Sequence, residues 1–449
     1  MEQLRDGART WIGSLSRLGR HPALRWLLPA QLVSALGDGM SMVAVAWLAV
    51  QIAPAGQAGV WTGLAVAAYA LPAPLGAALL APLMRRLRAA QLVAADATAR
   101  AVTLAAVAIL AVTGQLDPVV YVGLLAVSSL LHAWGSAGVY TLVAELLPEE
   151  DQVTGNALLS TFAQSAFVVG PALAGGLTAL AGPGWVIGVD AASFAVLAVA
   201  AWALAARQAA TAATGADAPE TPATGGWRAI LGNPRLLGLL LVTCAFFFLY
   251  GPVEVALPVH VAQGLHGSPG LLGLYWTVFG IGATVGALGA VLLRHRAPWP
   301  VVVVIIVGWG AALLPLGLTD AVAPGLVGFA AGGVIYGPFT AISTALFQRG
   351  APPHLLSRVL AARSALTTPA TGLGTLVGGP VVTAVGGRPT LLISALLTIA
   401  LGVGVAAVLR LTRRSSDTAT AASRAPGRAV ARDGRLVTAA AAPASPHLP

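Results

Sequence analysis

Among the carboxylates within long apolar stretches of the sequence are Asp38, Asp190 and Glu254. A charged side chain in the hydrocarbon of a membrane is costly unless it faces a partner or a water-filled cavity. A carboxylate beside a cavity can hold a proton while the cavity is dry and release it when the cavity opens to water. We therefore expect these residues to take part in proton coupling or to line a substrate cavity.

Each carboxylate also has a structural interpretation. Asp38 stands between Gly37 and Gly39, so it can cap or pack a helix. Glu254 lies near a helix end and can extend to the membrane surface. Asp190 can hydrogen-bond to backbone groups of a neighbouring helix. Both kinds of interpretation stay open at the level of sequence.

Two further ionisable sites lie in apolar surroundings. His132 falls near the middle of its stretch, and an imidazole titrates between about pH 5 and 8; the alternative is a hydrogen-bonded core residue. Asp96 and Arg100 are four residues apart, which places them on one face of a helix near its cytoplasmic end. With Arg86 in the preceding loop, we expect this pair to act as a gate element. The alternative is a plain ion pair within the helix.

The elements that must position these residues are membrane helices. The chain is 57% hydrophobic and only 9% charged, with a mean hydropathy of +0.83, which excludes a water-soluble globule. A membrane helix needs about 20 apolar residues, and no alternation typical of barrel strands appears. The twelve apolar stretches are 24–52, 59–83, 92–112, 119–144, 155–181, 185–205, 236–261, 270–293, 300–318, 323–347, 359–385 and 390–409.

Arginine clusters recur at every second gap between these stretches, except the gap after the fourth. Short Arg-rich loops stay in the cytoplasm, so both termini are expected there. The loop after the fourth stretch contains Glu149, Glu150 and Asp151 and is assigned to the cytoplasm by parity, because acidic residues count little in this rule. The net charge of +9 lies beside the membrane ends, where anionic headgroups explain it without a nucleic-acid partner. The first stretch is longer than the apolar region of a signal peptide, and we expect it to be retained as a helix.

The chain divides into five expected segments, and its two hydrophobic sets resemble each other. The segments are a cytoplasmic N-terminal segment 1–23, a six-helix bundle 24–207, a cytoplasmic linker 208–234, a second six-helix bundle 235–411 and a disordered cytoplasmic tail 412–449. Gly63, Gly76 and Arg86 recur in order as Gly273, Gly286 and Arg296. Such recurrence favours a duplication, and parallel six-helix repeats are a known transporter plan.

Four local motifs carry a family resemblance. They are S-A-L-G-D-G at 34–39, A-P-L-M-R-R-L-R at 81–88 followed by Asp96 and Arg100, G-P-A-L-A-G-G at 170–176, and D-A-A-S-F at 190–194. Together they resemble the major facilitator superfamily, and more narrowly its 12-helix drug:proton antiporter-like exporters, the group that includes macrolide and siderophore exporters. The resemblance covers nearly all of residues 24–411.

The sequence departs from the family pattern in the loop after the second helix. Ala81 stands where the family has Gly, and Arg85 stands where it has the Asp that helps to close the gate. Only Arg86, Asp96 and Arg100 correspond to the family's loop motif. In the fifth-helix motif, Ala replaces one glycine at position 174.

The resemblance implies a cavity lined by helices 1, 4, 7 and 10. The residues brought there would be Gln31, Asp38, His132, Glu254 and Tyr336, with Gln164 joining from helix 5. The helix 5 motif consists of Gly170, Pro171, Gly175 and Gly176. In it, the proline lacks a backbone donor and kinks the helix, whereas the glycines allow close approach of another helix.

The sequence therefore predicts an all-α polytopic membrane protein of two six-helix repeats, and not an enzyme. With one cysteine and no phosphate-binding, nucleophile-elbow or metal motif, we expect no cofactor and no metal. The predicted function is secondary export of a small amphipathic drug or secondary metabolite across the cell membrane by a monomer. Protons would neutralise Asp38 and Glu254 and weaken their hold on a cationic or polar part of the cargo. The alternatives are a proton-independent facilitator or uptake transporter, and a non-transporting receptor or assembly partner.

Overall fold

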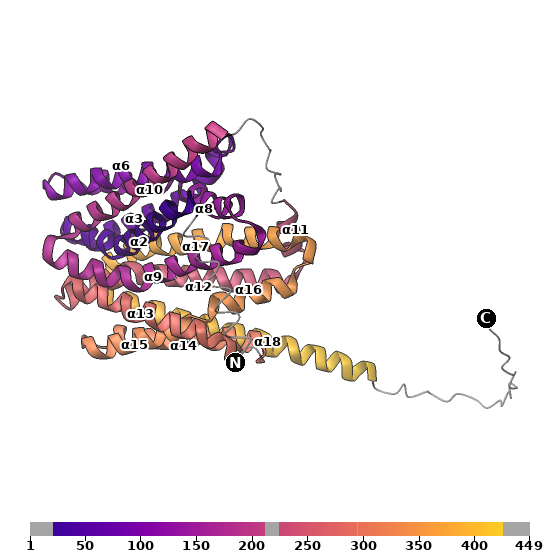
Figure 1. Ribbon diagram of the computed structural model, residues 1–449. Coiled ribbons are helices and arrows are strands. Elements are labelled where there is room, and N and C mark those ends of the chain that lie inside the picture. Colours follow the sequence, from indigo (N-terminus) through magenta and orange to yellow (C-terminus); the bar gives the residue numbers. More distant parts are fainter. Residues whose placement is uncertain (1–20, 212–223, 294, 425–449) are drawn as a thin grey trace, which may run out of the picture. The chain divides into compact units, whose positions relative to one another are not determined.

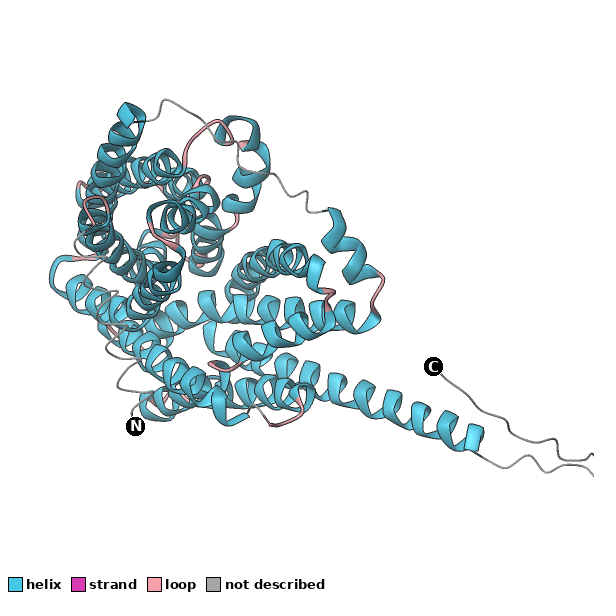
Figure 2. Ribbon diagram, turned by 45° about the vertical axis from the view of Figure 1, so that its right-hand side comes forward, coloured by secondary structure: helices cyan, strands magenta, loops and turns pink. Residues whose placement is uncertain are grey.

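The structure is a computed structural model that describes residues 21–211, 224–293 and 295–424. Figures 1 and 2 show helices joined by short loops, without a strand in the described ranges. The first half contains α2 Leu24–Ile52, α3 Ala58–Ala70, α4 Pro72–Leu79, α5 Ala81–Met84, α6 Ala89–Val112, α7 Pro118–Ser129, α8 His132–Leu146, α9 Glu149–Ala181 and α10 Pro183–Thr211. The second half contains α11 Thr224–Leu231, α12 Pro234–Val259, α13 Pro269–Gly289, α14 Pro298–Leu318, α15 Val322–Tyr336, α16 Phe339–Gly350, α17 Leu356–Val385 and α18 Gly387–Arg424.

Eleven segments of the described chain are long and apolar enough to cross a membrane. Some of them join consecutive helices, such as α3 with α4 and α7 with α8. The twelfth segment is α17, whose 30 residues suffice in length but include prolines, threonines and glycines that lower its hydropathy. These segments confirm the expected all-α polytopic fold.

Capping side chains mark where two of the spans begin. The side chain of Asp117 accepts a hydrogen bond from the backbone N–H of Val119, 2.8 Å away, and so caps α7. Asn233 caps α12 through the backbone N–H of Arg235 at 3.0 Å. A capping side chain of this kind satisfies a backbone donor that the helix leaves free.

The two halves share local irregularities at corresponding places. The fourth span, Pro118–Leu146, and the tenth, Val322–Gly350, are both 29 residues long, and each is broken into two helices near its middle. Gly182 and Gly386 end α9 and α17 with the same positive φ of 90°, a conformation that favours glycine. This agreement supports the duplication inferred from sequence.

Contacts between the two halves lie toward one face of the bundle. Because the spans alternate in direction, we call the face where α2 begins the N-terminal face and the opposite one the distal face. Helix α3 meets α17 near its distal end, where the backbone N–H of Val60 donates to Thr383 Oγ1 at 3.0 Å. Helix α9 meets α13 where a Cβ on Gly175 would lie 3.1 Å from the Cα of Gly270. The halves are therefore joined on the distal side.

The linker and the tail contain helical residues. Helix α11 lies within the expected linker, and its buried Ile230 packs with Leu236 and Val359 of the second half. From Ala406 the chain forms a separate compact unit, which begins inside α18. That helix runs past the expected boundary at 411 to Arg424. Most of the expected N-terminal segment, residues 212–223 of the linker and residues 425–449 of the tail lie outside the described residues.

Candidate functional site

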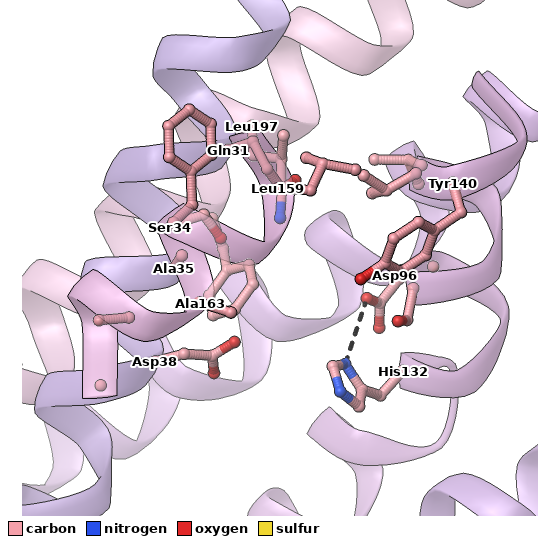
Figure 3. Close-up of a pocket in the computed structure, with 18 of the residues that line it drawn as sticks. Gln31, Ser34, Ala35, Asp38, Asp96, His132, Tyr140, Leu159, Ala163 and Leu197 are labelled. Atoms are coloured by element: carbon pink, nitrogen blue, oxygen red, sulfur yellow. Dashed lines mark ion pairs between the residues drawn. The ribbon is translucent and has the colours of Figure 1, made fainter. Parts of the chain in front are cut away.

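A cavity of about 370 Å³ lies inside the first six-helix bundle. Its walls come from α2, α6, α8, α9 and α10 (Figure 3). The polar side chains that line it are Gln31, Ser34, Asp38, Asp96, His132, Ser136 and Tyr140. The apolar wall includes Met42, Phe162, Phe167, Phe194 and Leu197. A mostly apolar cavity with a few converging polar groups is typical of a small-molecule site.

Two glycines determine the direction in which Asp38 points. A Cβ on Gly37 would overlap the Asp190 carboxylate of α10 and lie 2.5 Å from Ser193 Oγ. A Cβ on Gly39 would overlap the backbone carbonyl of Ala166 in α9. Both neighbouring helices can therefore pack closely against α2. The carboxylate between these glycines is left to face α3 and α6.

Asp38 forms a charged hydrogen-bonded group with residues of those two helices. Its Oδ1 accepts a hydrogen bond from Arg100 Nη1 at 2.9 Å and another from the Tyr69 hydroxyl at 2.5 Å. The Arg100 side chain is 2% exposed, and its guanidinium lies 5.0 Å from the ring of Phe194 and 5.5 Å from that of Tyr69. Arg100 is thus a buried cation whose hydrogen-bonded carboxylate partner is Asp38.

Asp96 lies close to the same guanidinium but is paired less well. Its Oδ1 is 3.5 Å from Arg100 Nε, and both of these buried atoms lack a hydrogen-bond partner. Its Oδ2 is 3.9 Å from His132 Nδ1, which is longer than a hydrogen bond. A Cβ on Gly135 would lie 2.5 Å from the Asp96 Cβ and 2.6 Å from its Cγ, so only glycine fits there between α6 and α8.

Asp190 is completely buried beside this group. Its carboxylate accepts a hydrogen bond from the Ser41 hydroxyl of α2, and the Ser193 hydroxyl lies 3.3 Å from Oδ1. The residue does not line the cavity. Asp190 joins α10 to α2 through Ser41, next to Gly37, so it supports the helix that carries Asp38.

The structure therefore brings together Gln31, Asp38, Asp96, Arg100 and His132, which the sequence had assigned to a cavity and a separate gate. Buried Gln31 Oε1 has no hydrogen-bond partner within the described structure. Sequence reasoning did not select Tyr69 or Gly135. A lone tyrosine in an apolar helix and a glycine within one turn of His132 were the available signals.

Besides Asp190, three residues that were expected at the cavity lie elsewhere. Gln164 lines a separate groove that also includes Thr284 of α13. Tyr336 packs against aromatic rings of the second half, with centroids 6.1 Å from Phe246 and 5.9 Å from Trp309. Glu254 is half-buried in α12 and does not line the cavity. The broad aromatic packing of the second half explains why Tyr336 does not face the cavity of the first.

The remaining gate residue lies at the N-terminal face. Arg86 is exposed in the turn between α5 and α6. It does not line the cavity that contains Asp96. The described residues include no cluster of three or more His, Cys, Asp or Glu side chains that could hold a metal ion.

The fifth-helix motif acts in packing. A Cβ on Gly170 would lie 2.6 Å from the Cα of Gly39 in α2, and Gly175 meets α13 at the distal junction of the halves. Gly176 faces open space. Pro171 lies inside α9, which continues through it, and its carbonyl oxygen approaches α13. The motif thus sets two helix contacts, one beside Asp38 and one between the halves.

Comparisons with known proteins agree with this fold. Residues 27–368 match the family model described as Major Facilitator Superfamily, and a second match covers 255–444. The multidrug efflux pump Tap of Mycobacterium tuberculosis is 31% identical over 399 residues, which cover 84% of this chain and 91% of the pump.

Solved structures share the fold at low sequence identity. The nucleoside transporter NupG has a TM-score of 0.69 at 14% identity, covering 86% of this chain and 98% of its own. A bacterial homologue of the iron transporter ferroportin, in an inward-facing state, has a TM-score of 0.64 at 18% identity, covering 85% and 98%.

Proposed function

The chain belongs to the Major Facilitator Superfamily, and from that premise we propose that it is a secondary active exporter driven by proton antiport. It is a multi-pass membrane transporter and not an enzyme. The proposed cargo is a small amphipathic drug or secondary metabolite, moved across the cytoplasmic membrane by a monomer. The likeness to a multidrug efflux pump along most of both chains supports the direction and the class of cargo.

The observation that carries the proposal is the Asp38–Arg100 pair at the edge of the cavity. Its 2.9 Å contact lies in the apolar bundle, and Asp38 stays 36% exposed toward the cavity. A carboxylate in this position can accept a proton, pair with the guanidinium or attract a cationic group of the cargo. Protonation removes its negative charge and so weakens both of the other interactions. Proton uptake by Asp38 would release Arg100 and weaken cargo binding, which is the exchange that antiport requires.

Alternating access is supported by the side on which the halves meet. The contacts of α3 with α17 and of α9 with α13 lie on the distal side. The cavity is lined by early residues of α6 and by residues in the second half of the fourth span, Pro118–Leu146, which puts it toward the N-terminal face. If both termini are cytoplasmic, as the Arg-rich loops favour, this conformation faces inward. In the opposite state the distal contacts would separate.

We assign the remaining predicted residues to supporting roles. Asp190 holds the helix of Asp38 in place, and Glu254 provides a second proton-binding group in the other half. Arg86 and the Asp96–Arg100 pair contribute to closing the N-terminal face. In this scheme Arg100 serves both the gate and the coupling group, because it contacts Asp38 and Asp96 together.

A second candidate function is proton-independent facilitation or uptake. The altered loop favours it, because Arg85 replaces the acidic residue that the family uses in its gate. Everted membrane vesicles separate the two candidates when they are screened with a compound panel, with and without an imposed pH gradient. Antiport predicts accumulation that collapses with the gradient and is lost in Asp38→Asn. Flux that ignores the gradient would favour the facilitator instead.

A further inference from the structure

The charges around the cavity do not balance. Two carboxylates, Asp38 and Asp96, line it, and the described lining residues include no Arg or Lys. Arg100 lies within ion-pair distance of both carboxylates and is not among the lining residues. His132 Nδ1 lies 3.9 Å from Asp96 and adds a positive charge only when the imidazole is protonated. One guanidinium compensates one carboxylate, so the cavity with both carboxylates ionised and the imidazole neutral carries a net negative charge. A buried charge of this kind needs a partner.

The geometry shows which carboxylate lacks that partner. Arg100 donates to Asp38 at 2.9 Å, and the Tyr69 hydroxyl donates to the same oxygen at 2.5 Å. The distance from Arg100 Nε to Asp96 Oδ1 is 3.5 Å, and the two atoms form no hydrogen bond. Asp96 Oδ1 is buried and has no other hydrogen-bond partner in the described structure. Arg100 therefore donates a hydrogen bond to Asp38 and none to Asp96, so Asp96 Oδ1 remains able to accept one.

Resting on the proposed function, we propose that Asp96 is the residue that recognises the cargo and that the cargo carries a protonated amine. Figure 3 shows Asp96 and His132 together on the side of the cavity opposite Asp38. Their 3.9 Å separation is too long for a direct hydrogen bond. An ammonium placed between them donates to the carboxylate oxygen and to an imidazole nitrogen that lacks hydrogen.

The rest of the wall suits the body of such a cargo. Aromatic rings of Tyr140, Phe162 and Phe167 line the same volume. They supply apolar contact and a negative ring face for a cation. The volume of about 370 Å³ lies near the lower end for small-molecule sites, which favours a compact amphipathic amine.

This assignment adds cargo binding to the gate role that the sequence motif suggested for Asp96. In the sequence it reads as part of a gate at the helix end, whereas in the structure it lines the cavity and is 11% exposed. Gly135 makes this possible, because its missing side chain leaves room for the carboxylate between α6 and α8. The gate residue Arg86 does not line this cavity.

The test uses two fluorescent probes that differ in one charge. Monodansylcadaverine carries a protonated amine, and its N-acetyl derivative is neutral. Binding of each is measured by dansyl fluorescence on the purified full chain in nanodiscs at pH 7.5, without a gradient. The wild type is expected to bind the amine at least tenfold more tightly than the acetylated probe, which is about 1.4 kcal/mol.

Asp96→Asn is expected to remove that preference, with at least a tenfold loss for the amine and less than a threefold change for the neutral probe. Retained binding of the neutral probe shows that the cavity has formed. The matched control is Asp320→Asn, the same chemical change in a surface ion pair with Arg388. It is expected to leave both affinities unchanged.

A second pair of variants avoids the buried carboxylate. Ser136 is exposed and lines the cavity, so Ser136→Lys places a tethered ammonium beside Asp96, while Ser136→Met adds similar bulk without charge. The Lys variant is expected to bind the amine at least tenfold more weakly than the Met variant. Equal affinities in these two variants, or equal binding of both probes by the wild type, would overturn the proposal.

The outcome is separable from that of the vesicle experiment. A protein that exports neutral compounds against a pH gradient and shows no preference for the amine keeps the proposed function and loses this inference. A protein that binds the amine through Asp96 but moves it without regard to the gradient keeps this inference and loses antiport.

Discussion

The Asp38–Arg100 pair is expected to be strongly coupled energetically, and a double-mutant cycle measures this. Removing one partner of a buried ion pair costs about 3–5 kcal/mol, because the other charge is left buried. Arg100 is 2% exposed and Asp38 is 36% exposed. We therefore expect Arg100→Gln to lower the free energy of unfolding by about 3 kcal/mol, at the low end of that range. Asp38→Asn should cost about 2 kcal/mol, because Asp96 remains 3.5 Å from the guanidinium.

The double variant is expected to lose about 3 kcal/mol instead of the ~5 kcal/mol sum, which gives a coupling energy of about 2 kcal/mol. In the double variant Asp38 and Arg100 no longer leave each other as an uncompensated charge, and Asp96 loses only the contact that it already loses in Arg100→Gln, which is why the combined loss is smaller than the sum. Unfolding is followed by tryptophan fluorescence during titration of mixed micelles with a denaturing detergent. The control is Asp320→Asn, whose ion pair with Arg388 is 59% and 39% exposed; its loss should stay below about 1 kcal/mol.

Additive losses in the Asp38 and Arg100 variants, within about 0.5 kcal/mol, would refute the reasoning. They would mean that the two side chains do not share a charge-dependent contact in the folded protein. A destabilisation by Asp320→Asn as large as that by Arg100→Gln would also count against it. In that case exposure would not determine the cost of losing a charged partner.

Three other predictions concern single contacts. Tyr69→Phe removes a 2.5 Å hydrogen bond to the Asp38 carboxylate and should lower the free energy of unfolding by about 2 kcal/mol in the same titration. An unchanged free energy of unfolding would mean that the hydroxyl forms no such bond. Gly135→Ala should displace the Asp96 carboxylate and cut transport at least tenfold in vesicles, whereas full activity would contradict the tight packing there. Cysteines replacing Val60 and Thr383, in a variant without the native cysteine, should cross-link and stop transport until reduced, and transport by the cross-linked protein would contradict separation of the distal contacts.

The sequence predicted the fold well because long apolar stretches are local signals. The first span was expected at 24–52 and is observed as Leu24–Ile52. The fourth and tenth spans were expected as single stretches, and each is broken into two helices. In the tenth the break falls beside Pro338, which cannot donate a backbone hydrogen bond. The break in the fourth has no such residue to explain it.

The site was less accessible to sequence reasoning because its contacts are long-range. Asp38 and Arg100 are 62 positions apart, and their pairing depends on how closely α2 packs against α9 and α10. That packing follows from Gly37 and Gly39, which look like ordinary small residues in a Gly-rich chain. Tyr336 was expected in the cavity from its helix alone, and its aromatic neighbours in the second half hold it elsewhere.

Proton release on cargo binding tests the central claim most directly. The purified protein is placed in a weakly buffered solution with a pH indicator, and a compound identified in the vesicle screen is added. If protonation of Asp38 and binding of cargo exclude each other, the wild type releases protons in proportion to bound cargo. Asp38→Asn then releases fewer protons. Saturating cargo binding without proton release by the wild type would contradict the account.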